Sequence, residues 1–213
     1  MDEAQDFSDE YWFAIEELLS EPKDGVLYLF TDPNQAIYRR HIQLPVKDEP
    51  FNLTINCRNT LHIHQAAYRY FQGELTDPPD IEGTEIVRIT GRSIEDEAAH
   101  VARETNRLIT SEGIRPAEVV ILVLGRPKKQ YYDALAKHSL GKGIRWSIEV
   151  HDSERVLIDT VKRFKGLEAA IVFVWLSPIP SDLNDREALY VGLSRAKSMV
   201  YIVGTEAACA ALA

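Results

Sequence analysis

The chain has 213 residues, enough for one large domain or for one domain with an additional segment, and its 45% hydrophobic and 27% charged residues are ordinary for a soluble globular protein. No apolar run approaches the roughly 20 residues of a membrane span, and the lack of a signal-peptide pattern, with only two cysteines, favours the reducing cytoplasm and no membrane partner. The net charge of −9 argues against a protein that coats nucleic acid nonspecifically, although it is compatible with a local basic groove.

Helices and strands alternate along the first half of the chain. Residues 8–19 predict a short helix, because Ser8 can cap it and Trp12, Ile15 and Leu19 fall on one face. Strands are expected over 26–30, 51–56 and 84–90, the first of them buried. Helices are expected over 61–72 and from Ser93 onward.

The second half continues the same alternation. The uninterrupted apolar run 117–125 is typical of a central parallel strand that is covered on both faces. Further strands are expected over 144–150, 156–161, 169–176 and 199–204, with helices over 128–138 and 185–197. This order predicts an α/β domain with a mainly parallel sheet flanked by helices.

Ligands of open α/β sheets bind beyond the carboxyl ends of the strands, so we expect the polar clusters of this chain to gather there. Asp2 and Glu3 are suited to hold Mg²⁺ and to activate a water, and the amide of Gln35 could sense a terminal phosphate. Arg58 and Arg195 could neutralise charge on a transferred phosphoryl group, because arginine is always ionised and forks onto oxygens.

The segment 164–168 adds Gly166, where a ligand could approach the backbone closely, and Glu168, which could accept a hydrogen bond from a sugar hydroxyl. Each of these residues also has a plainer interpretation. The acids could form a solvated tail, the arginines could be surface ion-pair partners, and the glycine could mark a simple turn.

Five segments in order resemble motifs II to VI of superfamily 1 DNA helicases of the UvrD/Rep type: DEAQDF, LFTDPNQAIYR, NLTINCRNT, TVKRFKGLE and ALYVGLSRAK. The resemblance implies a RecA-like fold of the P-loop NTPase type. It assigns residues 1–44 to a remnant of a first RecA-like domain, with motifs II and III. It assigns 45–213 to a second RecA-like domain without a large insertion.

The resemblance also implies an ATP-dependent motor that moves on single-stranded or partly duplex DNA, with ATP and Mg²⁺ as cofactors. It makes Asp2 the Mg²⁺ ligand, Glu3 the base for the attacking water and Gln35 the sensor of the γ-phosphate. Arg58 and Arg195 become arginine fingers. The remaining roles fall to residues near the nucleotide (Tyr38, Gly166 and Glu168) and to residues near the DNA (Arg39, Thr160 and Arg163).

The sequence departs from the family pattern at Thr31, Cys57 and Lys162, and Cys57 removes an aromatic ring that often stacks on adenine. No G-x-x-x-x-G-K-[ST] loop occurs in the 213 residues, so we expect a missing N-terminal RecA-like region of a parent protein to be a partner, and negligible ATP hydrolysis by this chain alone. Two alternatives stay open: a non-catalytic module that binds DNA or protein, and, more remotely, an unrelated nucleotide-binding α/β protein.

Overall fold

The computed structural model describes residues 1–19, 25–32, 44–72, 76–124, 128–141, 143–149, 152–176 and 183–212. Its helices are α1 (Asp9–Leu18), α2 (Leu61–Tyr68), α3 (Ile94–Thr110), α4 (Lys129–Leu135), α5 (Leu183–Ser194) and α6 (Glu206–Ala210), with short 3₁₀ turns η1 (Ala4–Asp6) and η3 (Pro116–Glu118). Its strands are β1 (Val87–Thr90), β2 (Val119–Val123), β3 (Arg145–Ser147), β4 (Arg155–Thr160), β5 (Ala169–Trp175) and β6 (Ala196–Gly204). No helix among these residues is long and apolar enough to cross a membrane.

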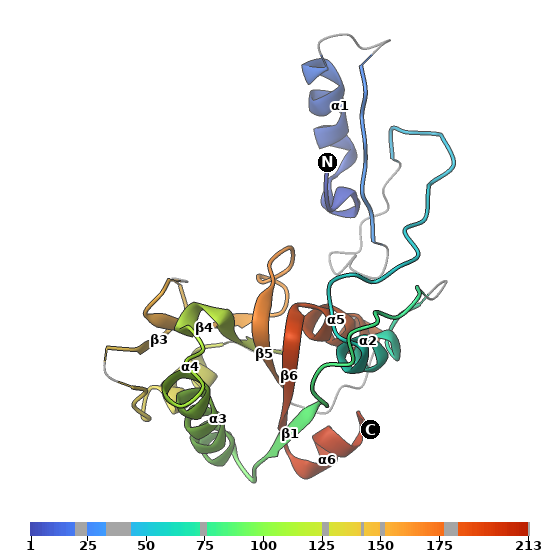
Figure 1. Ribbon diagram of the computed structural model, residues 1–213. Helices are drawn as coiled ribbons and strands as arrows, with labels where there is room; N and C mark the ends of the chain where they lie inside the picture. The colour runs from blue at the N-terminus through green and yellow to red at the C-terminus, as the bar shows by residue number, and fades with distance from the viewer. Residues whose placement is uncertain are drawn as a thin grey trace.

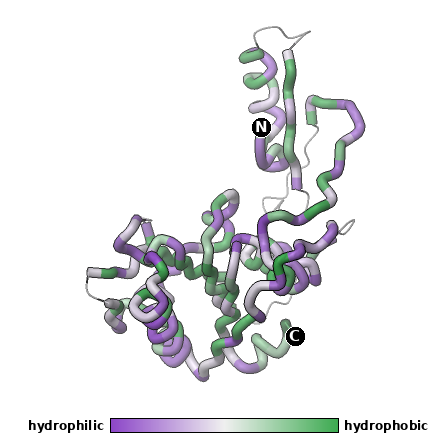
Figure 2. Tube along the Cα trace, viewed as in Figure 1, coloured by the Kyte–Doolittle hydropathy of each residue, from purple (hydrophilic) through white to green (hydrophobic). Residues whose placement is uncertain are grey.

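The six strands form one sheet in the order β1-β6-β5-β2-β4-β3, and every neighbouring pair is parallel. The hydrophobic strands lie at the centre and the more polar helices lie outside them (Figures 1 and 2). The predicted α/β domain with a parallel sheet is therefore confirmed. We call the part from α2 to α6 the sheet domain.

Two hydrophobic cores sandwich the sheet, one on each face. Val120, Leu122 and their neighbours pack with α2, α5 and α6, whereas Val119, Ile121 and Val123 pack with α3 and α4. All five side chains of β2 are buried, as expected for a central strand covered on both faces. The apolar run that predicted this strand is explained by its place in a three-layer domain.

A second, smaller part precedes the sheet domain. Residues 1–19 and 25–32, which we call the N-terminal arm, contain η1, α1 and an extended segment, and they rise away from the sheet domain (Figure 1). The predicted helix over 8–19 is confirmed as α1. Its Trp12 is buried and packs on Phe7, with ring centroids 5.5 Å apart.

The predicted strands over 26–30 and 51–56 are wrong. Both segments are extended, but the first only exchanges backbone hydrogen bonds with residues 1–4, and the second has a single bridge, from Ile55 to Asp77. Val26, Tyr28 and Phe30 are 72%, 73% and 54% exposed, so the first segment is not a buried strand either. A continuous apolar run favoured a strand over 26–30 and apolar alternation favoured one over 51–56, but among the described residues no sheet neighbour covers them.

Two boundaries near the C-terminus also differ from expectation. The last long helix was expected to run through Lys197, yet α5 ends at Ser194 and β6 begins at Ala196. Arg195 therefore occupies a helix-to-strand junction instead of a helix interior. The short helix α6, capped by the Thr205 hydroxyl, was not predicted.

A buried carboxyl group joins α3 to the carboxyl end of β5. Glu97 is almost fully buried and accepts a 2.6 Å hydrogen bond from the indole Nε1 of Trp175. Burial raises the pKa of Glu97, and the indole bond and the nearby Asp96 act on it less strongly. The folded protein therefore holds the proton on Glu97 more tightly than the unfolded chain does.

This pKa shift predicts how stability depends on pH. Because the folded pKa of Glu97 is raised, its contribution to the free energy of unfolding is largest below pH 4.5, the ordinary pKa of the group. That contribution is lost as the pH rises through the folded pKa. Glu97→Gln keeps an acceptor for Trp175 without an ionisable group. We expect urea unfolding to show that the advantage of Glu97→Gln over wild type grows from pH 4 to pH 7; a constant difference would contradict the shift.

Candidate nucleotide site

The acidic side of the site lies in the first residues of the arm. Glu3 has φ 52° and ψ 40°, the left-handed conformation that costs a non-glycine residue roughly 1–2 kcal/mol. Its Oε2 accepts a hydrogen bond from Gln5 Nε2 at 2.5 Å, and its backbone N–H donates to Asp2 Oδ1 at 2.9 Å. Gln5 Oε1 in turn accepts from the Asp32 backbone N–H at 3.2 Å, which orders the acids against the segment before residue 33.

A lysine of the sheet domain reaches these acids. Lys165 Nζ lies 2.6 and 2.7 Å from the two carboxylate oxygens of Asp6 and 3.2 Å from Glu3 Oε2. Its side chain is only 5% exposed. A second contact joins the same two parts, because the Tyr190 hydroxyl donates to Asp32 Oδ2 at 3.2 Å. The arm and the sheet domain therefore meet through charged and polar groups.

Glu168, on the sheet domain, lies between two cations. Lys197 Nζ is 2.6 Å from Glu168 Oε1, and Arg58 Nε is 3.5 Å from Oε2. The hydrogen bond from Lys197 holds the pKa of Glu168 below its ordinary value, with smaller help from Arg58 and Arg195. The structure thus brings together three residues that the sequence placed in separate motifs: Arg58, Glu168 and Arg195.

Arg195 is the buried member of this group, at 2% exposure. Its guanidinium donates to the backbone oxygens of Val191 and Leu167 at 3.2 and 3.4 Å. Burial lowers the pKa of Arg195, and Arg58 lowers it further, whereas the charge of Glu3 opposes the change. Arginine stays ionised despite such shifts, so the site holds a desolvated cation close to the acidic arm.

Asn59 fixes the junction that carries Arg195. Its buried Nδ2 donates to the backbone oxygens of Ser194 at 3.1 Å and of Ala196 at 2.5 Å, the residues on either side of Arg195. The Asn59 Oδ1 accepts from Asn56 Nδ2 at 3.0 Å. The loop that contains Arg58 is thereby tied to the turn between α5 and β6.

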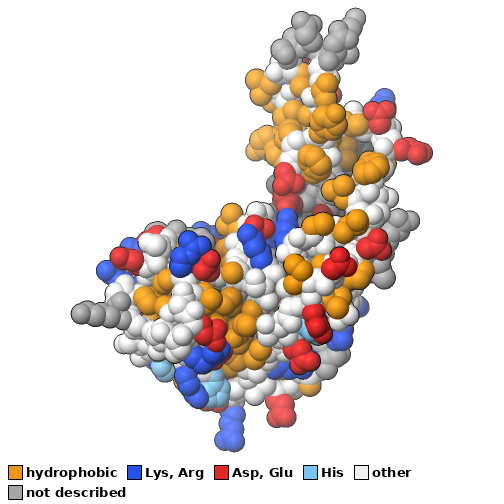
Figure 3. All heavy atoms as spheres, in the orientation of Figure 1, with side chains coloured by type: hydrophobic (Ala, Val, Ile, Leu, Met, Phe, Trp, Pro, Cys, Tyr) orange, Lys and Arg blue, Asp and Glu red, His pale blue; other side chains and the backbone are white. Residues whose placement is uncertain are grey.

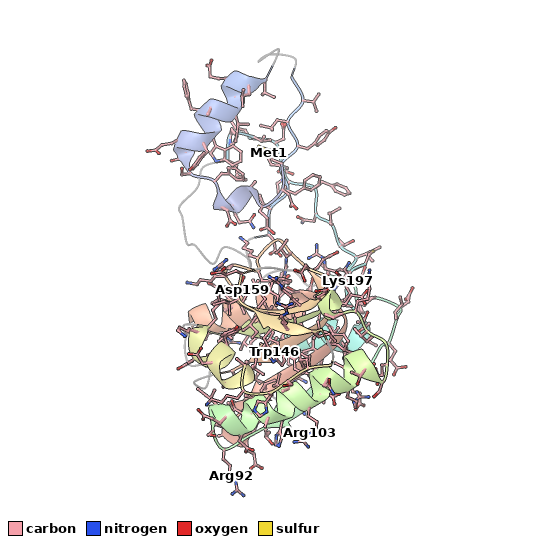
Figure 4. The ribbon with its side chains drawn as sticks, turned by 90° about the vertical axis from the view of Figure 1, so that its left-hand side faces the viewer. Met1, Arg92, Arg103, Trp146, Asp159 and Lys197 are labelled. Atoms are coloured by element: carbon pink, nitrogen blue, oxygen red, sulfur yellow. The ribbon has the colours of Figure 1, made fainter. Side chains whose placement is uncertain are left out.

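The site lies at the opposite end of the strands from the expected one. Glu168 directly precedes β5 and Arg195 directly precedes β6, where the Ala169 N–H donates to the Arg195 oxygen at 3.1 Å. Lys197 lies at the end of the sheet domain that faces the arm, whereas Arg92 and Arg103 lie at the far end (Figure 4). The expectation of carboxyl ends is wrong for Glu168 and Arg195, because their side chains come from the segments that enter the strands.

The predicted DNA residues lie elsewhere. Thr160 ends β4, at the level of Val123 in β2, and its Oγ1 accepts from the Arg163 N–H at 3.3 Å. Arg163 is exposed and its Nε lies 3.5 Å from Asp159 Oδ1, which also binds Lys128 Nζ at 2.9 Å. The crossover 161–168 thus runs from the carboxyl end of β4 to the amino end of β5.

Gly166 lies in this crossover with φ 80°, a conformation that favours glycine, and no atom within 4 Å would meet a Cβ there. The backbone therefore accounts for the glycine without a ligand. Gln35, Tyr38 and Arg39 lie outside the described residues. Cys57 is exposed.

Several residues of the site were not singled out from the sequence: Asp6, Asn59, Lys165 and Lys197. Asn59 and Lys165 are nearly buried polar side chains, a feature that sequence periodicity does not reveal. The signal available was their position inside the quoted motifs, beside residues that were chosen. The contacts of Asn59 and Lys165 reach across 135 to 162 residues, so only the folded chain identifies their partners.

Residues 155–203, from β4 into β6, match the family model of the UvrD-like helicase C-terminal domain. This matched segment of the sheet domain is therefore similar to a UvrD-like helicase C-terminal domain. Among solved structures, the C-terminal domain of a possible DNA helicase from Lactobacillus plantarum WCFS1 is similar, with a TM-score of 0.52 and 19% identity over 70% of this chain and 86% of that one. That likeness supports the fold. None of the curated protein sequences matches the chain.

The acids of the arm also bear on the expected Mg²⁺ site. Among the described residues, no three His, Cys, Asp or Glu side chains are grouped as a complete metal site. Mg²⁺ in nucleotide sites needs only one or two carboxylates, because phosphate oxygens and waters supply the remaining ligands. The exposed carboxylate of Asp2 fits this requirement, whereas Glu3 is already bound by Gln5 and Lys165.

Proposed function

We propose that this chain is the part of an ATP-dependent DNA helicase or translocase that couples nucleotide binding to movement on single-stranded DNA. The observation that carries the proposal is the convergence of motif residues from distant parts of the sequence. Glu3, Arg58, Glu168 and Arg195 gather where the arm meets the amino ends of β5 and β6. Arginine pairs beside carboxylates are the arrangement that a phosphoryl-transfer site requires.

Each residue has a chemical task in this proposal. The Arg58 and Arg195 guanidinium groups bind phosphate oxygens and neutralise charge that develops on them. Glu168 accepts a hydrogen bond from a ribose hydroxyl once Arg58 turns toward phosphate, while Lys197 stays bound to its other oxygen. Glu3 takes a proton from water, and its left-handed backbone is local strain of the kind that clusters at active sites. When bound through Asp2, Mg²⁺ would neutralise phosphate charge.

We assign DNA binding to residues at the start of the crossover that ends at Glu168. Arg163 is exposed and supplies a phosphate contact, and Thr160 supports its turn. Arg163 and Glu168 lie in the same crossover, 161–168, and Thr160 directly precedes it. Movement of that crossover on nucleotide binding would therefore change the DNA contact directly.

The alternative function, a module that binds DNA or protein without hydrolysing ATP, is favoured by one observation. Large hydrophobic side chains gather on the surface of the arm and of the segment after it, including Phe13, Leu18, Tyr28 and Phe51 (Figure 3). Exposed apolar patches mark protein–protein contacts. In the motor proposal, the body of a first RecA-like domain covers this surface; in the alternative, another protein does.

Fluorescence anisotropy with a labelled oligo(dT) strand tests the proposal. We expect the strand to bind, with an affinity that changes when a non-hydrolysable ATP analogue and Mg²⁺ are added. Arg163→Glu should weaken binding about tenfold or more, because it reverses the charge of one phosphate contact. Lys129→Glu, on the exposed side of α4, is the matched control. DNA affinity that ignores the nucleotide would favour the non-catalytic module, and no binding at all would contradict both DNA-binding versions.

A further inference from the structure

Lys165 is a nearly buried cation that joins the sheet domain to the arm. Its ammonium group contacts Asp6 and Glu3, which are 159 and 162 residues away in the sequence. A buried ammonium is costly unless carboxylates surround it, and a carboxylate left without its cation is costly too. Each partner therefore restrains the other.

The backbone of Lys165 is itself firmly placed. Phe164 before it is fully buried in the core beside α5, and the Leu167 N–H donates to the Phe164 oxygen at 3.1 Å. Gly166 after it holds the turn with its positive φ. The lysine thus extends from a hydrogen-bonded turn of the sheet domain to a short 3₁₀ turn of the arm, η1.

We propose that Lys165 is the positioning residue that sets Glu3 and Asp6 in register with Arg58, Glu168 and Arg195. This inference rests on the proposed function, and it assigns Lys165 a task that Gly166 and Glu168 do not perform. Lysine suits the task because its ammonium is a point charge with three donors, which can serve two carboxylates at once. The Asp6 contacts anchor the 3₁₀ turn, and the 3.2 Å contact orients the Glu3 carboxylate.

Hydrogen–deuterium exchange of the whole chain tests the contact itself. Lys165→Met should speed exchange of the Ala4, Asp6 and Phe7 amides about tenfold or more, because their acceptors lie within the arm that it releases. Amides of β5 should exchange as in wild type, which would show that the sheet domain is folded. Asp6→Asn removes the contact from the other side and should act alike. Lys165→Arg should restore much of the protection, whereas a Lys129→Met control should change neither region.

Measurements of nucleotide affinity then distinguish a Lys165 that positions the acids from a Lys165 that only stabilises the fold. We expect Lys165→Met to lower the affinity for a Mg²⁺-bound ATP analogue about tenfold, and we expect Lys165→Arg to keep most of the wild-type affinity. Two results would overturn the role of Lys165 and leave the proposed function intact. In the first, amide exchange in the arm is the same in Lys165→Met as in wild type. In the second, Lys165→Met keeps the nucleotide affinity of wild type although Arg195→Gln lowers it. Absence of nucleotide binding by wild type would overturn the proposed function; faster arm exchange in Lys165→Met would still support the positioning of Glu3 and Asp6.

Discussion

Asn59→Asp is expected to lower the free energy of unfolding by about 3–5 kcal/mol, although it changes one NH₂ group into an oxygen. The Asn59 Nδ2 donates to two buried carbonyl oxygens at 3.1 and 2.5 Å. Aspartate keeps the acceptor for Asn56 but presents an oxygen to both carbonyls. Urea unfolding measures the loss, and the Asn52→Asp variant, at an exposed position, controls for the added negative charge.

The pH dependence of this variant sharpens the test. A carboxyl group at residue 59 would have its folded pKa raised by burial and by the facing carbonyls, so its protonated form is favoured in the folded state. The protonated acid can donate one of the lost hydrogen bonds. The destabilisation should therefore shrink as the pH falls toward 4, and a defect of equal size at pH 4 and pH 7 would contradict the assigned donor role of Asn59.

Arg195→Gln should weaken binding of a Mg²⁺-bound ATP analogue about 10- to 100-fold and leave ADP affinity nearly unchanged. The expectation follows if the guanidinium contacts the terminal phosphate, since one charge-assisted hydrogen bond contributes about 1.5–3 kcal/mol. Glutamine keeps part of the buried packing that Arg195 makes beside Val191 and Leu167. Isothermal titration calorimetry with both nucleotides gives the two affinities.

Arg103→Gln is the matched control for this experiment. Arg103 is exposed on α3, at the end of the sheet domain far from the arm (Figure 4). The control should bind both nucleotides as wild type does. Equal losses of ATP and ADP affinity in Arg195→Gln would contradict a contact with the terminal phosphate, and a collapsed unfolding free energy would identify the residue as a support of the α5–β6 junction.

The sequence was most informative where burial is two-sided. β2 and β5 have continuous apolar runs because side chains of both faces enter a core, and such runs stand out without any knowledge of the fold. Prediction was wrong over 26–30 and 51–56, where apolar residues are exposed. An apolar run or an apolar alternation shows that a segment has a hydrophobic surface, but neither shows whether a neighbouring strand covers that surface.

The motif residues could also be predicted only in part. The quoted motifs pointed to Arg58, Glu168 and Arg195, and the tertiary structure brings these three together. Their place at the amino ends of the strands could not be predicted, because it depends on which side of a strand each connecting segment enters. For Gln35, Tyr38 and Arg39 the expectation stays a prediction, since they lie outside the described residues.

The α/β class, the order of the motifs and the residue types capable of phosphate chemistry could all be predicted from the sequence, because they follow from local periodicity and side-chain chemistry. The contacts of Lys165 with Glu3 and Asp6, and those of Asn59 around Arg195, were revealed by the folded chain. These contacts join residues 135 to 162 positions apart, and their strength comes from burial that no local pattern records. Contacts between residues that are distant in the sequence and become buried on folding therefore could not be predicted from local sequence patterns.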